Sequence, residues 1–429
     1  MSRILVSSVD PWSERVGSDT LSSLVSSYPA SQIASLNIRV QKSDSKVAGR
    51  YFHIIEERVI KSIFNKTIVT GESYLPIDSS NEKEKEVEER RYGKKKPCRS
   101  FLVLLRELAW KFGRWKTQEL DDFIQDFAPD ALFFPIEGYI HFNRINQYII
   151  NKFHPKRVVG YMWDDNFTYK QHPYNVLYLI HRFWLRKSVK ALVSNCDEVF
   201  AISPKLKREL DAEYGIESIL LTKPIKDSVS YNPYAPSDPI RILYTGKLII
   251  GRDRTIADIA DAMREINKEG KKVALDIYTN TEVTEKVKER IEKSEGCRVH
   301  GFVPQQEVFQ IQQKADVLLF AEALSKGDMS ARLSFSTKIT DYLSAGKCIW
   351  AVGNKELAPI EYMKEYDAAL VSTCKEEVRK QLRNLIENKG IIPYYAQKAY
   401  ECGRTNHSKE MIQSRFQGAI FGTEWRSNN

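Results

Sequence analysis

The sequence lacks the residue patterns that hold a metal ion or a disulfide framework. Its six cysteines, at positions 98, 196, 297, 348, 374 and 402, include no CxxC pair, and its seven histidines include no HxxxH pair. Cysteines scattered in this way are typical of reduced thiols in a cytoplasmic protein. We therefore expect neither a zinc site nor a redox pair, and no metal held by the protein.

Long apolar runs are absent as well. No stretch approaches the roughly 20 apolar residues that span a bilayer, and the opening MSRILVSSVD turns polar too early for a signal peptide. We expect Ile4–Ser8 to be a first strand instead. The formal net charge is +9, which favours anionic partners. Because no nucleic-acid-binding module is recognisable, we expect phosphorylated or lipid partners and no nucleic acid.

The chain of 429 residues is too long for one ordinary hydrophobic core, and its composition, 42% hydrophobic and 28% charged, is that of a globular protein. Short apolar runs alternate with helical stretches in two series. The expected strands of the first series are Ile4–Ser8, Ala131–Pro135, Arg157–Met162, Glu198–Ile202 and Ile219–Thr222. Those of the second are Ile240–Thr245, Val273–Tyr278, Cys297–His300, Val317–Ala321, Cys348–Val352 and Ala369–Ser372, with helices at Arg254–Lys268 and Val283–Ser294. This alternation predicts α/β domains with parallel sheets.

The two series meet at a stretch rich in turn-forming residues. Residues 226–239 contain three prolines, which favours a linker. We expect two Rossmann-like domains that face a central cleft, one over residues 1–230 and one over residues 238–405. Ligands of open α/β sheets bind beyond the carboxyl ends of the strands, so residues that follow the strands are the candidates for a site.

Two neighbouring segments of the first domain have unusual patterns. Residues 81–96 are dominated by Glu, Lys and Arg, and they form either a solvated segment or a tether to an acidic surface. The next segment has apolar residues at helical spacing, namely Phe101, Leu104, Leu105, Leu108, Phe112 and Trp115. This stripe either packs on its own sheet or lies in a lipid interface. The tether and the lipid interface together predict a peripheral membrane contact through residues 82–116.

The segment Phe335–Gly353 predicts a polar helix start, a short helix and a buried strand. Ser336 and Thr337 can cap the helix. A helix start directs free backbone N–H groups and a partial positive charge at its surroundings, which suits a phosphate. Lys338 adds a full positive charge, and Asp341 can accept hydrogen bonds from sugar hydroxyls.

Two further strand ends of the second domain carry residues that could bind other parts of a nucleotide. In TGKLIIGRD, Gly246 lets the backbone approach a ligand, and Lys247 and Arg252 can neutralise a diphosphate. A basic loop of this kind can also be solvated surface. In HGFVP, Phe302 and its neighbour Val303 can pack on a base, or Phe302 can belong to the core.

In the first domain, YMWDDN places two carboxylates at the end of a strand. Asp164 or Asp165 could orient or deprotonate an acceptor hydroxyl. Because adjacent side chains alternate in direction, we expect at most one of them to face the acceptor. The alternative is a cap for the following segment, and His141 is a rival for the catalytic role.

Three segments stand in the order TGKLIIGRD, GFVPQQEVFQIQQKADVLLF and FSTKITDYLSAGKCIWAVG. As an ordered set they resemble the donor-binding half of GT-B fold glycosyltransferases, especially the retaining family-four (group 1) type. The resemblance covers most of residues 240–375. It is looser in the N-terminal half, where residues 7–20 resemble the glycine-bearing first loop and residues 195–207 resemble a strand and turn of the family. It implies that a C-terminal helix, residues 408–429, crosses back to the first domain.

The resemblance implies a role for each matching residue. Lys247 and Arg252 would hold the donor diphosphate, Gly17 and Gly246 would lie near the phosphates, Phe302 and Val303 would contact the base, and Ser336, Thr337 and Lys338 would lie at the phosphate–sugar end. Asp341 takes the place of the glutamate that binds the donor ribose.

The sequence departs from the family in the part that would face the sugar. The first glutamate of the family's E-x7-E pair falls at Leu333, so Glu322 or another group would have to supply its contact. The second glutamate is shortened to Asp341, and Ser336 replaces a proline. Lys223 and Pro224 stand where the family has Asn-Gly.

The resemblance implies a retaining, metal-independent glycosyltransferase of the hexosyltransferase type. It would move a sugar from a nucleotide-diphosphate sugar to a hydroxyl of a glycan or glycolipid, in polysaccharide or cell-envelope glycan biosynthesis, without a further cofactor. The donor would bind the second domain and the acceptor the first, in the cytoplasm or at the inner face of the membrane. A GT-B-fold nucleotide-sugar epimerase and a non-catalytic nucleotide-sugar-binding protein are the alternatives. The sugar, the base and the acceptor are left open.

Overall fold

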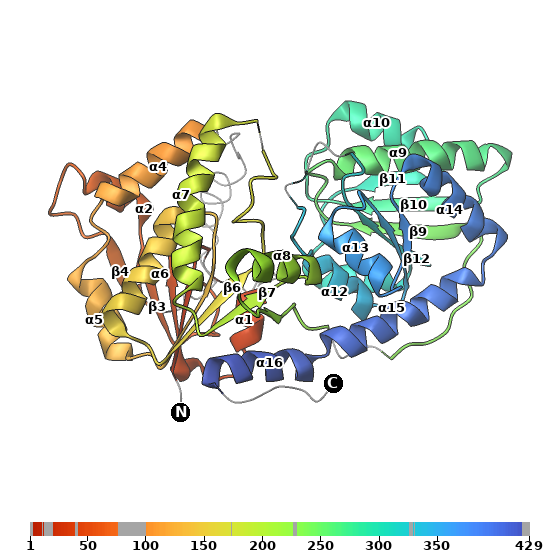
Figure 1. Cartoon of the computed structure of the whole chain (residues 1–429). Coiled ribbons are helices and arrows are strands. Elements are labelled where there is room, and N and C mark those ends of the chain that lie inside the picture. The colour runs from red at the N-terminus through yellow and green to blue at the C-terminus, as the bar shows by residue number, and fades with distance from the viewer. Residues whose placement is uncertain are drawn as a thin grey trace. The chain divides into compact units, whose positions relative to one another are not determined.

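The computed structural model describes residues 3–10, 12, 20–38, 42–75, 100–172, 174–225, 230–325, 329 and 331–422. The chain divides into two compact units, and many of their elements are labelled in Figure 1. Unit 1 comprises Met1–Ile202, Lys207–Leu221 and Gln413–Asn429, and unit 2 comprises Ser203–Leu206 and Thr222–Ile412. Each unit is built around one sheet in which parallel strands dominate, so the predicted α/β class with Rossmann-like sheets is confirmed.

Unit 1 contains an eight-stranded sheet with the order β4-β3-β2-β1-β5-β6-β7-β8. Its strands are β1 (Ile4–Ser8), β2 (Ile33–Asn37), β3 (Arg50–Ile54), β4 (Gly71–Tyr74), β5 (Ala131–Pro135), β6 (Arg157–Met162), β7 (Glu198–Ala201) and β8 (Ile219–Leu220). Neighbouring strands are parallel except β3 and β4. Strands β2, β3 and β4 were not predicted from the sequence. Strands β2 and β3 include buried polar residues, namely Ser35, Asn37 and His53, and β4 (GESY) contains no apolar run.

The helices of unit 1 are α1 (Thr20–Val25), α2 (Glu56–Lys61), α4 (Ser100–Phe112), α5 (Gln118–Phe127), α6 (Ile140–Phe153), α7 (Val176–Val193), most of α8 (Pro204–Tyr214) and the end of α16 (Lys409–Phe421). The chain returns to unit 1 at Gln413. There Phe416 packs against Phe133, with ring centroids 5.0 Å apart, and the carbonyl of Ala419 accepts two hydrogen bonds from the Arg157 guanidinium. These contacts attach the last helix to the sheet of unit 1.

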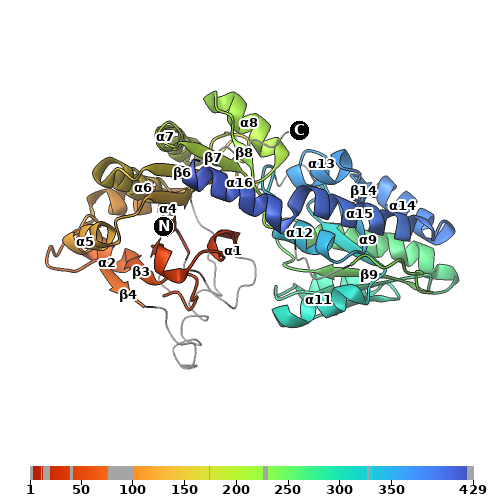
Figure 2. The same ribbon diagram turned by 90° about the horizontal axis from the view of Figure 1, so that it is seen from below.

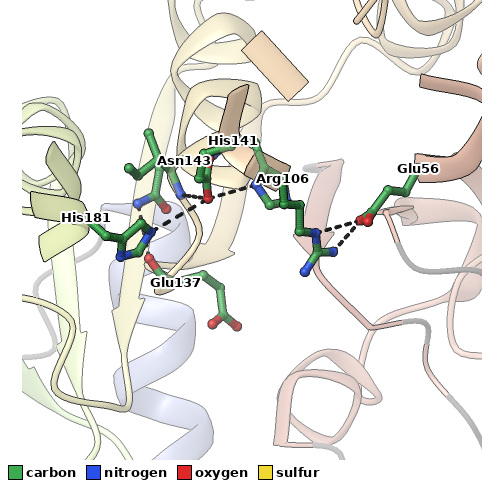
Figure 3. Close-up of polar contacts among 8 residues, drawn as sticks. Glu56, Arg106, Glu137, His141, Asn143 and His181 are labelled. Atoms are coloured by element: carbon green, nitrogen blue, oxygen red, sulfur yellow. Dashed lines mark hydrogen bonds and ion pairs between the residues drawn. The ribbon is translucent and has the colours of Figure 1, made fainter. Parts of the chain in front are cut away.

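Helix α4 packs with its only acidic residue facing inward. Both oxygens of Glu107 accept backbone N–H groups at the start of α6, at 2.9 Å from Ile140 and 2.8 Å from His141. Oε1 also lies 3.0 Å from Nδ1 of His141, and the His141 ring stacks on Trp110. Figure 3 shows the polar neighbours of this carboxylate, among them His141 and His181. Glu107 therefore caps α6 from another helix.

The apolar stripe of α4 does not pack on the sheet. Phe101, Leu105, Leu108 and Phe112 are exposed, and of the predicted stripe Trp115 alone is buried. Of the two alternatives for this stripe, packing on its own sheet is therefore wrong for most of its residues. The contacts of Glu107 and Trp110 determine which side of the helix faces inward.

Replacing Glu107 with alanine should lower the free energy of unfolding by about 3 kcal/mol, because the substitution leaves buried N–H groups without an acceptor. Denaturant unfolding measures the loss, and Glu217→Ala, which removes an exposed carboxylate of unit 1, should change stability little. A loss no larger than that of the control would show that the cap is unimportant.

The same carboxylate also gives a pH dependence. Burial alone would raise the pKa of Glu107, but the hydrogen bond with His141 and the nearby His181 lower it from its usual 4.5 to about 2. A lowered pKa in the folded state stabilises the protein above about pH 4.5, and the contribution is lost as the pH falls toward 2. Glu107→Gln should flatten this part of the stability profile.

Unit 2 contains a six-stranded sheet with the order β11-β10-β9-β12-β13-β14. Its strands are β9 (Ile240–Thr245), β10 (Val273–Tyr278), β11 (Cys297–His300), β12 (Val317–Ala321), β13 (Cys348–Val352) and β14 (Leu370–Ser372), and all pairs are parallel. Its helices are α9 (Arg252–Ile266), α10 (Glu285–Glu292), α11 (Gln305–Gln313), α12 (Thr337–Ser344), α13 (Ala358–Glu365), α14 (Lys375–Glu387) and α15 (Ile391–His407). The predicted strands of this unit agree with the structure to within one residue.

Candidate functional site

The sheet of unit 2 has a topological switch point between β9 and β12. The first strand of the unit lies beside its fourth, so the chain leaves these neighbouring strands in opposite directions. Ligands of such sheets bind at this point, beyond the carboxyl ends of the strands. The first residue beyond the carboxyl end of β9 is Gly246, and the first beyond that of β12 is Glu322.

A buried ion pair joins the two sides of the switch point. The guanidinium of Arg252 forms a bidentate pair with the carboxylate of Glu322, through contacts of 2.9 and 2.7 Å. The Glu322 carbonyl accepts a hydrogen bond of 2.8 Å from the Thr255 hydroxyl of the same helix α9. Bidentate pairs are geometrically specific, so the Arg252 side chain is held at the carboxyl edge of the sheet.

The ammonium of Lys338 reaches the same place from α12. It lies 3.3 Å from the hydroxyl of the buried Tyr244 and over the ring of that tyrosine. It also fills the space beside Gly246, where a Cβ atom would overlap Nζ and where φ is 140°. Burial, and then the charge of Arg252, lower the pKa of Lys338 from its usual 10.5 to about 7. This lysine is therefore poised to gain a proton when an anion binds beside it.

Helix α12 points its first turn toward this cluster. Ser336 is its N-cap, and the hydroxyl accepts the Lys338 N–H at 3.4 Å. Thr337 is the first helical residue, and α12 packs against α15 (Figure 2). The buried residues Ile339, Tyr342 and Leu343 fix the helix on the unit. Its free N–H groups and partial positive charge add to those of Lys338 and Arg252.

The residues at the positions of the family's two glutamates have different structural surroundings. Asp341 pairs with Lys223, with Nζ 3.0 Å from Oδ1, so the residue at the unusual Lys-Pro position contacts the proposed ribose-binding carboxylate. Leu333 is fully buried, and its carbonyl accepts a hydrogen bond of 3.0 Å from Ser203. The position of the family's first glutamate is a packing position in this chain.

Other predicted donor residues lie at neighbouring strand ends. Phe302 is 72% exposed after β11, so the alternative that it belongs to the core is wrong. Val303 follows it, and the Lys247 side chain is exposed after β9. These three residues follow the carboxyl ends of β9 and β11, two strands of the same sheet.

An aromatic pair that was not predicted from the sequence lies at the same edge. His300 stacks on Tyr278 with ring centroids 4.4 Å apart, and its Nε2 lies 2.8 Å from Oδ1 of Asp276. The pair follows from the register of β10 and β11, in which Tyr278 lies opposite His300. Once the two strands are taken as parallel neighbours that end at the same edge, this pairing is predictable from the sequence.

The candidates of unit 1 lie after β6 and at the start of α6. Asp165 is buried, and its carboxylate accepts hydrogen bonds from the backbone N–H and the hydroxyl of Thr168. Asp164 is partly exposed. His141 is buried against Glu107, and burial lowers its pKa. Gly17 lies outside the described residues. The carboxylate of Asp165 and the ring of His141 are thus both engaged in contacts within unit 1, with Thr168 and Glu107 respectively.

Among the residues that the structure describes, no group of three or more His, Cys, Asp or Glu side chains could hold a metal ion. Within the same residues, no helix has both the length and the apolar character needed to cross a membrane.

Solved structures match nearly the whole chain. No protein-family model and no curated protein matches the sequence. The structure of Anabaena Alr3699/HepE in complex with UDP is 10% identical, with a TM-score of 0.63 over 98% of this chain and 100% of that chain. The apo form of the lipopolysaccharide outer core galactosyltransferase WaaB is 15% identical, with a TM-score of 0.58 over 98% and 99% of the two chains.

A third match is a putative UDP-N-acetylglucosamine 2-epimerase from Listeria monocytogenes, which is 12% identical, with a TM-score of 0.52 over 100% of both chains. At these identities the likeness concerns the fold. The chain has the GT-B fold, as its three ordered motifs predicted.

Proposed function

We propose that the protein is a glycosyltransferase that uses a nucleotide-diphosphate sugar as its donor. The observation that carries this proposal is the convergence of Gly246, Arg252 and Lys338 at the switch point of unit 2. The similar Anabaena protein has been solved with UDP and with UDP-glucose, which favours a UDP-sugar as the first donor to test.

Each donor residue has a chemical task in this proposal. A leaving nucleoside diphosphate gains negative charge as the glycosidic bond breaks, and fixed positive groups stabilise that charge. The positive groups are the side chains of Arg252, Lys338 and Lys247 and the backbone N–H groups after Ser336 and Thr337. With these groups in place, the reaction requires no protein-held metal. Asp341 accepts hydrogen bonds from the ribose, and Phe302 and Val303 contact the base.

The acceptor half of the proposal rests on unit 1. A hydroxyl of a glycan or glycolipid would be oriented by Asp164, since the carboxylate of Asp165 is bound to Thr168. We propose retention of anomeric configuration and transfer of a hexose, in the cytoplasm at the inner face of the membrane. The described part of the proposed membrane segment 82–116 is residues 100–116.

Substitution of the two aspartates should separate their roles. Asp164→Asn should lower turnover by about 10²-fold while donor affinity stays unchanged. Asp165→Asn should instead lower the melting temperature, because it weakens the turn with Thr168. Initial rates and thermal unfolding of both variants measure the difference. Normal turnover by Asp164→Asn would remove it from the acceptor site.

A thermal-shift screen against a panel of nucleotide sugars tests the proposed donor. A ligand that binds the folded state raises the melting temperature by mass action, so the true donor should stand out from its analogues. NMR of the incubated donor then distinguishes the activities. Transfer to an acceptor supports the proposal, whereas epimerised sugar without an acceptor supports the alternative that the Listeria structure favours. Binding without any turnover would support a non-catalytic binding protein.

A further inference from the structure

Helices α4 and α7 lie side by side in unit 1 (Figure 1). Each of them exposes a row of apolar side chains. The exposed side chains of α4 are Phe101, Leu102, Leu105, Leu108 and Phe112, and those of α7 are Val176, Leu177, Ile180, Phe183 and Trp184. These side chains, referred to as the α4–α7 apolar surface, recur at spacings of three and four residues and therefore form a stripe on each helix. Exposed apolar patches of this kind mark interaction sites.

Polar contacts on the opposite sides hold both helices in this orientation. In α4, Glu107 is buried at the start of α6, and Arg106 reaches Glu56 at the start of α2 (Figure 3). In α7, the buried Arg182 donates hydrogen bonds of 2.8 Å to the Asp165 carbonyl and 2.7 Å to Gln171. On each helix these polar side chains face inward beside buried apolar residues such as Trp110 of α4 and Leu185 of α7, while a second row of apolar side chains stays exposed.

The charges that accompany this surface are positive. Helix α7 contains no Asp or Glu, and the only acid of α4, Glu107, is buried. The ammonium of Lys187 lies 4.5 Å from the ring centroid of Phe183 and 5.0 Å from that of Trp184, and Lys111 lies over Phe112. Apolar and aromatic side chains with lysines beside them match the interface of an anionic bilayer.

We propose that the α4–α7 apolar surface docks unit 1 on an anionic membrane surface. Phe112 and Trp184 enter the interface, while Lys111 and Lys187 pair with lipid phosphates. A protein partner is disfavoured because lysine is depleted at the cores of protein–protein interfaces. The proposed surface adds α7 to the membrane contact predicted for α4, and it is independent of the donor site. If the proposed glycolipid acceptor is correct, docking would bring the protein to it.

Co-sedimentation of the full chain with vesicles tests this surface. The protein should pellet with phosphatidylcholine vesicles that contain about one third phosphatidylglycerol, and less with phosphatidylcholine alone. The double variant Phe112→Ser/Trp184→Ser should bind about tenfold more weakly. Lys111→Gln/Lys187→Gln should weaken binding to the anionic vesicles and reduce its sensitivity to salt.

The matched control is Tyr394→Ser. Tyr394 is 54% exposed in unit 2, against 55% for Trp184 in the surface, and its loss should leave vesicle binding unchanged. Thermal unfolding verifies that the surface variants, all at exposed positions, are folded. Failure of the wild type to pellet, or equal pelleting by the Phe112/Trp184 variant, would overturn the proposal. A wild-type dimer in sedimentation velocity that this variant dissociates, without vesicle binding, would assign the surface to a second copy instead.

Discussion

Replacing Arg252 with alanine should lower the turnover of the nucleotide sugar by about 10²-fold or more, since one fixed charge at a developing anion is worth a few kcal/mol. The structure adds a second effect. The substitution leaves the carboxylate of Glu322 buried without its partner, which costs about 3–5 kcal/mol of stability and places a negative charge near the diphosphate. Initial rates at saturating donor, together with thermal unfolding, measure both effects.

A double variant separates the charge effect from the loss of stability. Arg252→Ala/Glu322→Gln removes both charges and should recover most of the lost stability while turnover stays low. Arg254→Ala is the matched control, because Arg254 is exposed on the same helix, and it should behave like the wild type. Near-normal transfer by the double variant would remove Arg252 from the diphosphate site.

Binding of UDP-glucose should take up a proton at Lys338 above about pH 7, where the unliganded lysine loses its charge. The bound diphosphate favours the charged ammonium and so raises its pKa. Affinity should therefore weaken as the pH rises from about 7, because binding takes up a proton and the proton concentration falls. Calorimetry in buffers of different ionisation enthalpy measures the uptake directly. Lys338→Met should bind more weakly and take up no proton.

The control for this prediction is Lys347→Met. Lys347 also lies over a tyrosine ring, 4.0 Å from the centroid of Tyr234. It follows the end of α12, whereas Lys338 lies in the first turn of that helix, so proton uptake should persist in Lys347→Met. Stability provides a second readout. Because the folded pKa of Lys338 lies below its usual 10.5, the unfolded chain binds more protons between about pH 7 and 10.5, and stability rises with pH there. Uptake unchanged in Lys338→Met would contradict the assignment.

The strands of unit 2 were predictable because their residues form continuous apolar runs. Cys348–Val352 is buried throughout, as both faces of a parallel sheet are covered. Unit 1 was harder to predict, since Ser35 and Asn37 in β2 and His53 in β3 are fully or almost fully buried. Burial of these polar side chains depends on tertiary neighbours that sequence periodicity does not contain.

The orientation of α4 was not predictable for a related reason. Hydrophobic periodicity indicates which residues share a face, but not which face is buried. The buried face of α4 is set by Glu107. Its carboxylate accepts a backbone N–H at the start of α6, 33 residues further along the chain. A buried carboxylate that caps a distant helix leaves no local signal in the sequence.

The candidate site was predictable where residues follow strands. Gly246, Arg252 and Lys338 were all named from their positions at helix starts and strand ends, and the structure brings them together. Their pairing with partners was not predictable, because Glu322 and Tyr244 contact them through side-chain geometry. The ion pair of Lys223 with Asp341 likewise depends on the fold of the unit.

Photo-crosslinking with 5-azido-UDP-glucose tests most directly whether unit 2 holds the donor at this edge. The azide lies on the base, so labelled peptides report where the base is bound. We predict adducts within residues 300–303, around Phe302, that unlabelled UDP-glucose suppresses and that Arg252→Ala/Glu322→Gln weakens. Specific adducts confined to unit 1, or saturable binding that never labels the peptides after β11, would contradict the account.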